Sequence, residues 1–390
     1  MIYLDSAATT PTDPAVVEAM LPFLCEHFAN PSANYSAARM VRKAVQTARE
    51  QVATLLGAHT DEIVFTSCGT ESINTTIASV RASWPEKSDL IIANTEHAAT
   101  LEAAKRWNGQ VIRVPVNNDG LIDLDQLRAL LRPGHAALVS ILWANNETGV
   151  IAPMHEITEI AHAAGALVHA DAVQAVGKIE IDLRKVPIDF LSLSGHKFHA
   201  PKGIGALFVS QRVRFAPLLV GGGQENGRRS GTENIPGIVA LGKAASLCGQ
   251  HDLQSLRDHF EQRLMSALPD SIIHSACAPR LPNITSICFP GIDAAGMLIL
   301  LDKAGIACSA GSACHSAALH PSHVLEAMGF DAAHAASTLR FSFSRLNTQT
   351  ETEAAAAAVI EAVHKMRSER GGNSVVIINK EYPHEPPLNL

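Results

Sequence analysis

Short apolar runs alternate with helix-like segments along the first half of the chain. Runs of strand type cover residues 63–66, 90–93, 110–115, 137–143, 166–170, 190–193 and 206–209. A helical pattern starts near Glu71, and another spans residues 153–164 and ends at Gly165, a residue suited to a left-handed helix end. Strands and helices alternating at this spacing predict an α/β fold, with a mostly parallel sheet and helices on both of its faces.

The pattern changes near residue 250, where shorter strands and charged helices predict a second, smaller α+β domain. The elements expected there are a helix over 252–267 and strands over 283–288 and 339–344. The last helix is expected to start at Thr350, to form a capping box with Glu353 and to reach about Arg367. The expected units are an N-terminal segment over 1–15 that joins the small domain, a large domain over 16–255, the small domain over 256–370 and a tail over 371–390.

The composition indicates a folded protein with sizeable cores. Apolar residues make up 47% of the 390 residues and charged residues 18%, which excludes wholesale disorder. The net charge of −7 argues against direct nucleic-acid binding, which favours a basic face. The longest apolar stretch, 136–144, is far shorter than the roughly 20 residues of a membrane span, and the N-terminus lacks a signal-peptide pattern. Seven scattered cysteines fit reduced thiols, so we expect a cytoplasmic protein without a membrane partner.

Residues that could take part in catalysis or ligand binding follow three of the predicted strands. Lys197 follows the strand at 190–193 within SGHK, and Asp171 follows the strand at 166–170, with Gln174 three residues further on. The segment 66–72, TSCGTES, opens a helix whose free N–H groups could bind phosphate. Taken singly, these features are also typical of a solvated lysine and of ordinary helix caps. In open α/β sheets, however, ligands bind at the carboxyl ends of the strands, where all three features fall.

Together the three features match the requirements of pyridoxal phosphate. This cofactor needs a lysine for its aldehyde, an acidic partner for its ring nitrogen and a phosphate site. We therefore expect pyridoxal phosphate as the cofactor. No metal site is expected, because His155 and His162 are seven residues apart, whereas two zinc ligands on one helical face are four apart.

Five motifs extend this interpretation to a family. They are LDSAATTP at 4–11, NNETG at 145–149, SGHK at 194–197, RSGT at 229–232 and GSAC at 311–314. The sequence resembles the cysteine desulfurases, which belong to the class V aminotransferase group of fold-type-I pyridoxal-phosphate enzymes. The resemblance covers residues 1–368 in matching order, and it implies that the large domain binds the cofactor.

The resemblance implies a role for each matching residue around the cofactor ring. Lys197 would form the Schiff base, Asp171 would pair with the pyridinium nitrogen, and His97 would stack on the ring and move protons. Asn146 and Gln174 would hold the substrate side and the ring hydroxyl.

Other matching residues would contact the phosphate or the substrate. By the same resemblance, the phosphate contacts are Gly69, Thr70, Ser194 and His196. Thr232 would reach the cofactor phosphate of a partner subunit, which implies a homodimer. Arg340 would bind the substrate carboxylate through its planar fork of donors.

Cys314 lies in a run of small residues, SAGSACHS at 309–316, and resembles the family's nucleophile. The small domain would carry this nucleophile loop. The implied reaction converts L-cysteine to L-alanine and leaves a persulfide on Cys314. The persulfide sulfur would then pass to an acceptor protein for iron–sulfur cluster assembly or thiolation.

Three alternatives stay open at this point. A selenocysteine lyase of the same family would share most of these motifs, and another class V aminotransferase or lyase would not need Cys314. A non-catalytic sulfur-relay scaffold would bind partners without turnover. Cys308, six residues before Cys314, could be a resolving thiol, although a packed residue is the simpler interpretation.

Overall fold

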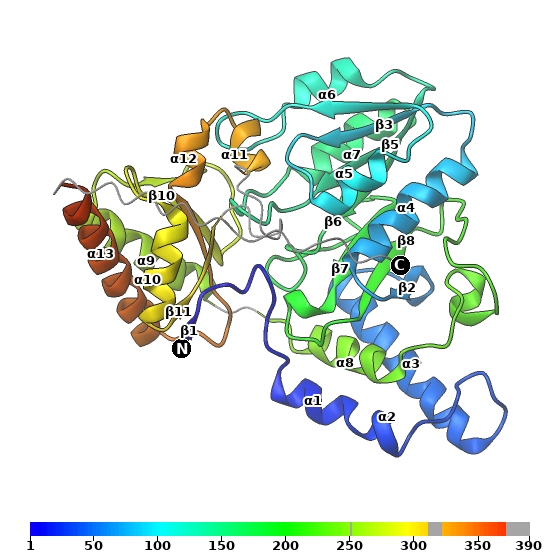
Figure 1. Ribbon diagram of the computed structural model, residues 1–390. Helices are drawn as coiled ribbons and strands as arrows, with labels where there is room; N and C mark the ends of the chain where they lie inside the picture. Colours follow the sequence, from blue (N-terminus) through cyan, green and yellow to red (C-terminus); the bar gives the residue numbers. More distant parts are fainter. Residues whose placement is uncertain (250–251, 311–321, 372–390) are drawn as a thin grey trace, which may run out of the picture.

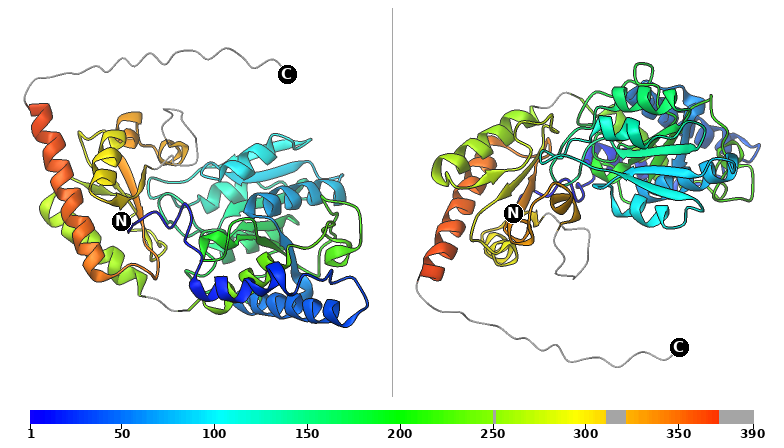
Figure 2. Two further views of the ribbon diagram at one scale, coloured as in Figure 1. Left: turned by 60° about the horizontal axis from the view of Figure 1, so that its bottom comes forward. Right: turned by 90° about the horizontal axis from the view of Figure 1, so that it is seen from above.

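The computed structural model describes residues 1–249, 252–310 and 322–371 of the chain. Figure 1 shows a large body built on one wide sheet and a smaller body built on a narrower one, with the N-terminus on the smaller body. Figure 2 shows the same two bodies from two further directions. The functional residues of both bodies meet at the boundary between them.

The large domain is organised around a seven-stranded sheet. Its strands, in spatial order, are β2 (Ile63–Thr66), β8 (Gly205–Val209), β7 (Phe190–Ser194), β6 (Leu167–Asp171), β5 (Ala136–Leu142), β3 (Asp89–Ala93) and β4 (Gln110–Val114). Neighbours from β7 to β4 are parallel, whereas β8 is antiparallel to both β7 and β2. The predicted mostly parallel sheet is confirmed, and each predicted strand lies within one residue of the observed one.

Helices cover both faces of this sheet, because alternate strand residues point to opposite sides. Leu90 and Ile92 contribute to the apolar cluster that includes α4 and α5, whereas Ile91 contributes to the cluster on the other face. The helices of this domain are α1 (Pro14–Met20), α2 (Pro22–Cys25), α3 (Ser36–Leu56), α4 (Gly69–Ser83), α5 (Ala98–Ala104), α6 (Leu124–Leu130), α7 (Met154–Ala163) and α8 (Ile235–Ser246). As predicted, α7 is followed by Gly165 in the left-handed region, with φ of 74°.

Helix α3 was not predicted from the alternation of strands and helices, although it is the longest helix of the large domain with 21 residues. Its buried side chains recur every three or four positions and face α8. The two helices approach closely because position 242 is glycine. A Cβ on Gly242 would lie only 2.5 Å from the Cα of Ala48. In Figure 1 helices α3 and α8 lie side by side below the sheet of the large domain.

The small domain packs helices against an antiparallel sheet. The strand order is β12 (Ser309–Ala310), β13 (Thr338–Ser342), β10 (Ile284–Cys288) and β9 (Ile272–Ile273). Its helices are α9 (Leu253–Ala267), α10 (Ala294–Lys303), α11 (His323–Ala327), α12 (Ala332–Ala336) and α13 (Gln349–Gly371). Phe260 packs against Phe341 and Phe343 at ring-centroid distances of 4.9 and 5.5 Å, and these three rings are fully buried. The small domain therefore has a hydrophobic core of its own.

The first residues of the chain connect the two domains. Strand β1 (Ile2–Tyr3) pairs in parallel with β11 (Ile306–Ala307) of the small domain. A few residues later, the Thr10 N–H donates to the carbonyl of His196 in the large domain, at 2.8 Å. The segment therefore runs along the boundary where the two domains meet, as the blue trace of Figure 1 shows.

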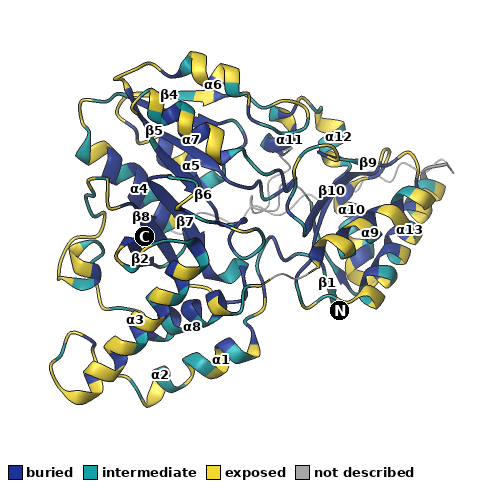
Figure 3. Ribbon diagram, turned by 180° about the vertical axis from the view of Figure 1, so that it is seen from behind, coloured by how far each residue is buried: buried dark blue, intermediate teal, exposed yellow. Residues whose placement is uncertain are grey.

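Burial follows this layered arrangement. In Figure 3 the central strands are buried, and the outward faces of the helices are exposed. In the part of the chain that the structure describes, no helix combines the length and apolar character needed to cross a membrane.

The start of α13 differs from the prediction. Thr348 caps this helix: its Oγ1 accepts from the Glu351 N–H at 3.2 Å, and Glu351 Oε2 accepts from the Thr348 N–H at 2.9 Å. The capping box predicted at Thr350 and Glu353 is therefore wrong by two residues. The same Thr-x-x-Glu spacing occurs twice in succession, and the second glutamate instead binds His259 of α9, at 2.6 Å.

We expect Thr348→Ala to lower the free energy of unfolding by about 1 kcal/mol, because it removes the capping side chain. Thr350→Ala is the matched control and should change stability by less than about 0.5 kcal/mol, because Thr350 is exposed. Urea unfolding followed by circular dichroism measures both. Equal losses in the two variants would contradict the assignment of the cap.

Candidate active site

A cleft of about 740 Å³ lies at the carboxyl ends of the central strands. It brings together most of the residues that the sequence singled out. The predicted site residues that line it are Gly69, Thr70, His97, Asn146, Asp171, Gln174, Ser194, His196, Lys197 and Arg340. Thr232 lines a different cavity, and Cys314 lies outside the described residues.

Lys197 reaches into this cleft from the short 3₁₀ helix η2 (Gly195–Lys197), which directly follows β7. Its Nζ donates to the carbonyl oxygens of Ala7 and Ala8, at 2.7 and 2.8 Å. The Gln174 side chain also donates to the Ala7 carbonyl, at 2.8 Å. The N-terminal segment therefore forms one wall of the site and helps to orient the lysine, a role that no side-chain motif indicated.

Asp171 ends the neighbouring strand β6 and is 2% exposed. Its Oδ1 accepts from the backbone N–H of Val173 at 3.1 Å. Burial raises the pKa of Asp171 to about 6, although this N–H and the charge of Lys197 act in the opposite direction. A cationic N–H donor placed in the cleft would favour the ionised carboxylate. The arrangement therefore suits a protonated ring nitrogen.

The start of α4 forms the third part of the site. Gly69 and Thr70 lie in its first turn, where backbone N–H groups have no partner within the helix. Glycine is required there, because a Cβ on Gly69 would lie 2.6 Å from Cγ2 of Val173. Ser194 lies next to Gly69, since a Cβ on Gly69 would lie 3.6 Å from the Cβ of Ser194, and its buried Oγ has no hydrogen-bond partner in the described part of the chain. An anion at this position would satisfy both sets of donors.

Two histidines line the cleft and make different contacts. His97 caps α5, because its Nδ1 accepts from the Ala99 N–H at 3.1 Å, which leaves Nε2 as the ring nitrogen available to other groups. His196 Nδ1 lies 3.0 Å from Thr9 Oγ1. Burial and three nearby lysines lower the pKa of His196 to about 4, so its ring is neutral at pH 7.

Arg340 is 1% exposed and is held by two groups. One terminal nitrogen donates to Asp5 Oδ1 at 2.8 Å, and the other donates to the Asn146 carbonyl at 2.8 Å. Its Nε has no partner among the described residues. The sequence analysis missed the role of Asp5, because Asp5 is 335 residues away from Arg340 along the chain, although it lies within the LDSAATTP motif.

Glu147 is another buried acid that the sequence analysis missed. It accepts a short hydrogen bond from the Oγ of Ser322, and burial raises its pKa to about 7. Glu147 lies in the NNETG motif, and Ser322 caps α11 of the small domain. This contact fastens α11 to the large domain beside Asn146.

The surroundings of Cys308 distinguish between a resolving thiol and a packed residue. Burial raises the pKa of the Cys308 thiol to about 12, with a further contribution from Asp5. Such a thiol stays protonated at neutral pH and is a weak nucleophile, which favours packing over a resolving role. Cys68, in contrast, lines the cleft directly beside Gly69.

Comparison with known proteins identifies the class. The profile of the class-V aminotransferase family matches residues 2–354. A cysteine desulfurase of Nostoc sp. is 48% identical over 377 residues, which cover 94% of each chain. A cysteine desulfurase of Cereibacter sphaeroides is 47% identical over 362 residues, which cover 90% of this chain and 93% of that protein.

Solved structures agree with these matches. A NifS-like protein superposes with a TM-score of 0.87 at 36% identity, covering 93% of this chain and 99% of the other. SspA in complex with cysteine superposes with a TM-score of 0.81 at 33% identity, covering 89% and 100%.

The chain belongs to the class-V aminotransferase family, whose members share the fold-type-I architecture and use pyridoxal phosphate. Within that family, the relatives that it matches over nearly their whole length are cysteine desulfurases. The family, the fold class and the cofactor inferred from the motifs are thereby confirmed. The roles of individual residues stay predictions.

We expect Asp171→Asn to stabilise the cofactor-free protein at pH 7.5 by up to about 3 kcal/mol. The folded-state pKa of about 6 is above the usual 3.8, so ionisation of Asp171 costs stability as the pH rises between these values. The difference between variant and wild type should therefore vanish below about pH 4. Urea unfolding at several pH values measures it, and a difference independent of pH would contradict the pKa assignment.

We expect Asp5→Asn to raise KM for L-cysteine about tenfold with a smaller change in kcat, because Arg340 loses the charged partner that orients it. Steady-state kinetics of alanine formation measures both constants. Asp270→Asn is the matched control, because Asp270 pairs with Arg367 on the surface, at 2.7 Å. An unchanged KM in Asp5→Asn would show that Arg340 is oriented without Asp5.

Proposed function

We propose that this chain is a pyridoxal-phosphate-dependent cysteine desulfurase that converts L-cysteine to L-alanine and collects the sulfur on Cys314. The observation that carries the proposal is the placement of Lys197, buried Asp171 and Arg340 around one cleft. These residues offer an amine, an acid and a carboxylate-binding guanidinium, which a sulfur amino acid and its cofactor require. The identity to cysteine desulfurases over nearly the whole chain supports the choice of reaction.

The residues present fit the cofactor. The first turn of α4, with Gly69 and Thr70, and the unpartnered Ser194 Oγ would hold its phosphate. Buried Asp171 would hold the proton of the ring nitrogen, and the unpartnered Oε1 of Gln174 would accept from the ring hydroxyl. When bound, pyridoxal phosphate supplies an electron sink for the charge that develops on the substrate Cα.

The protein's own groups then have distinct tasks. Arg340 binds the substrate carboxylate through its guanidinium, which lines the cleft. The Lys197 amine takes the proton from the substrate Cα, and His97 transfers a second proton beside the cofactor ring. The Cys314 sulfur accepts the substrate sulfur as a persulfide, while the three carbons and the amino group leave as L-alanine.

We also propose a homodimer in which Thr232 contributes to the partner's cofactor site. Thr232 lines a cavity separate from the cleft of its own chain. Helices α1 and α2 and the loop after them carry exposed apolar side chains, among them Leu21, Leu24 and Phe28, which are 55, 59 and 80% exposed. This apolar surface supports contact with a second subunit at these helices. We further propose an acceptor protein of iron–sulfur assembly or thiolation for the sulfur, and a cytoplasmic location.

The test is alanine release from L-cysteine in the presence of a thiol reductant. Wild type should turn over, and Cys314→Ser should lose at least about 100-fold in rate, because the serine hydroxyl cannot carry the sulfur. Cys277→Ser, at an exposed cysteine, is the matched control and should match wild type. Equal rates for Cys314→Ser would exclude Cys314 as the nucleophile, and a wild type that is inactive on L-cysteine but active on L-selenocysteine would replace the proposed function.

A further inference from the structure

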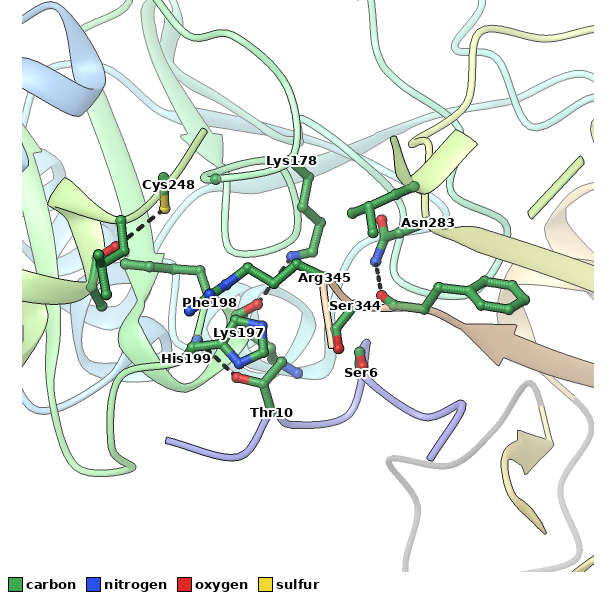
Figure 4. A pocket seen from close by; sticks show the side chains of 15 residues that line it. Ser6, Thr10, Lys178, Lys197, Phe198, His199, Cys248, Asn283, Ser344 and Arg345 are labelled. Atoms are coloured by element: carbon green, nitrogen blue, oxygen red, sulfur yellow. Dashed lines mark hydrogen bonds between the residues drawn. The ribbon is translucent and has the colours of Figure 1, made fainter. Parts of the chain in front are cut away.

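A second cavity adjoins the cofactor cleft and shares Lys197 with it. The space in it that a water-sized molecule can occupy is about 40 Å³, compared with about 220 Å³ in the cleft. Figure 4 shows that its walls come from three parts of the chain: Ser6 from the N-terminal segment, Lys178 from the large domain, and Asn283 with Arg345 from the small domain. None of these four residues has a role in the proposed reaction.

Lys178 brings a poorly compensated amine to this cavity. In the described part of the chain its one hydrogen bond runs from Nζ to the Lys197 carbonyl, at a long 3.3 Å. Burial and, to a smaller extent, the charge of Lys197 lower the pKa of Lys178 to about 7. A partly buried ammonium without a carboxylate partner among the described residues is destabilising, so an anion beside it would stabilise the folded protein.

Two buried polar atoms in the same cavity also lack partners among the described residues. They are the Oγ of Ser6 and the Oδ1 of Asn283, on side chains that are 1 and 0% exposed. The Asn283 Nδ2 donates to the Phe343 carbonyl at 3.1 Å, which fixes the orientation of this amide and leaves its oxygen as an acceptor. Buried polar groups of this kind are normally satisfied by a ligand or by water.

The balance of charge in the cavity is positive. Arg345 reaches it from the end of β13 and pairs with Asp13. Cys248 contributes no charge, because burial raises the pKa of its thiol to about 11, and His199 is neutral because burial lowers the pKa of its ring. Among the described residues at this cavity, the cations Arg345 and Lys178 therefore outnumber the one paired carboxylate, that of Asp13.

We propose that this cavity binds a small oxyanion that carries a proton, such as hydrogencarbonate or hydrogenphosphate. Lys178 and Ser6 provide donors for its oxygens, and Asn283 Oδ1 accepts from its hydroxyl. A halide would leave Asn283 unsatisfied, and the small volume excludes a bulky ligand. The bound anion bridges the N-terminal segment and both domains.

The experiment measures anion binding to the holoenzyme by calorimetry and by the thermal unfolding midpoint Tm. Sodium hydrogencarbonate, sodium phosphate and sodium chloride are compared at equal ionic strength and pH 7. We expect a saturable rise in Tm with one of the two oxyanions and none with chloride. The stronger of the two identifies the anion, and no saturable binding of either would overturn the proposal.

Substitutions test the site itself. Lys178→Met should abolish the saturable binding, Ser6→Ala should raise Kd about tenfold, and Lys178→Arg, which keeps the charge, should retain binding. Lys185→Met is the matched control at a lysine whose side chain is 73% exposed, and it should bind like wild type. Binding by Lys178→Met equal to that of wild type would overturn the proposal, and Lys178→Arg distinguishes lost binding from misfolding.

A pH series gives a readout that a purely structural lysine would not change. The groups that face Lys178 are Lys197, Arg345 with its partner Asp13, His199 and Cys248, and the pKa of Lys178 is lowered to about 7, chiefly by burial. The Kd for hydrogencarbonate should therefore rise about tenfold per pH unit above pH 7 in wild type. In Lys178→Arg it should stay constant, and the same pH dependence in both proteins would contradict the role of Lys178.

Discussion

Hydrogen bonds from Lys197 to the carbonyls of Ala7 and Ala8 connect the reacting amine to the N-terminal segment. The same segment is fixed to the small domain, because the Ala7 N–H donates to the Oγ of Ser342 at 2.9 Å. A backbone carbonyl cannot move without the segment that carries it, so Lys197, the N-terminal segment and β13 are held in fixed positions relative to one another. The position of Arg340 on β13 relative to Lys197 depends on these contacts, and so does the fit of any substrate that spans them.

Buried acids give the site a second constraint. Asp171 is fully enclosed, and Glu96, one residue before His97, is buried with one carboxylate oxygen unpartnered among the described residues. Burial raises the pKa of Glu96 well above its usual value, and the charge of Asp171 adds to the effect. Ionisation of Asp171 therefore disfavours ionisation of Glu96. A single ring cation beside Asp171 would favour the ionised form of that carboxylate.

The sequence predicted the large sheet and the residues at its strand ends because both depend on local patterns. Lys197 and Asp171 each follow a buried strand directly, so the topology alone brings them to one edge. The pairing of Asp5 with Arg340 could not be predicted, since no local pattern shows which buried arginine an acid will meet 335 residues away. The start of α13 was ambiguous for the opposite reason: two equivalent local signals overlap, and contact with α9 decides how the second glutamate is used.

The contact between β1 and β11 has a consequence for the synthesis of the protein. Residues made early, at positions 2–13, bind partners made much later, such as Ser342 and Arg345. On the ribosome they can pair with the large domain once residues near His196 have emerged, but their partners in the small domain come only after most of the chain has been made. The large sheet can therefore form earlier from its own strands, whereas the wall beside its lysine is fixed to the small domain only then. Enzymatic competence is therefore the final event of folding, and an extension or a deletion at the N-terminus would delay it more than a change of similar size elsewhere on the surface.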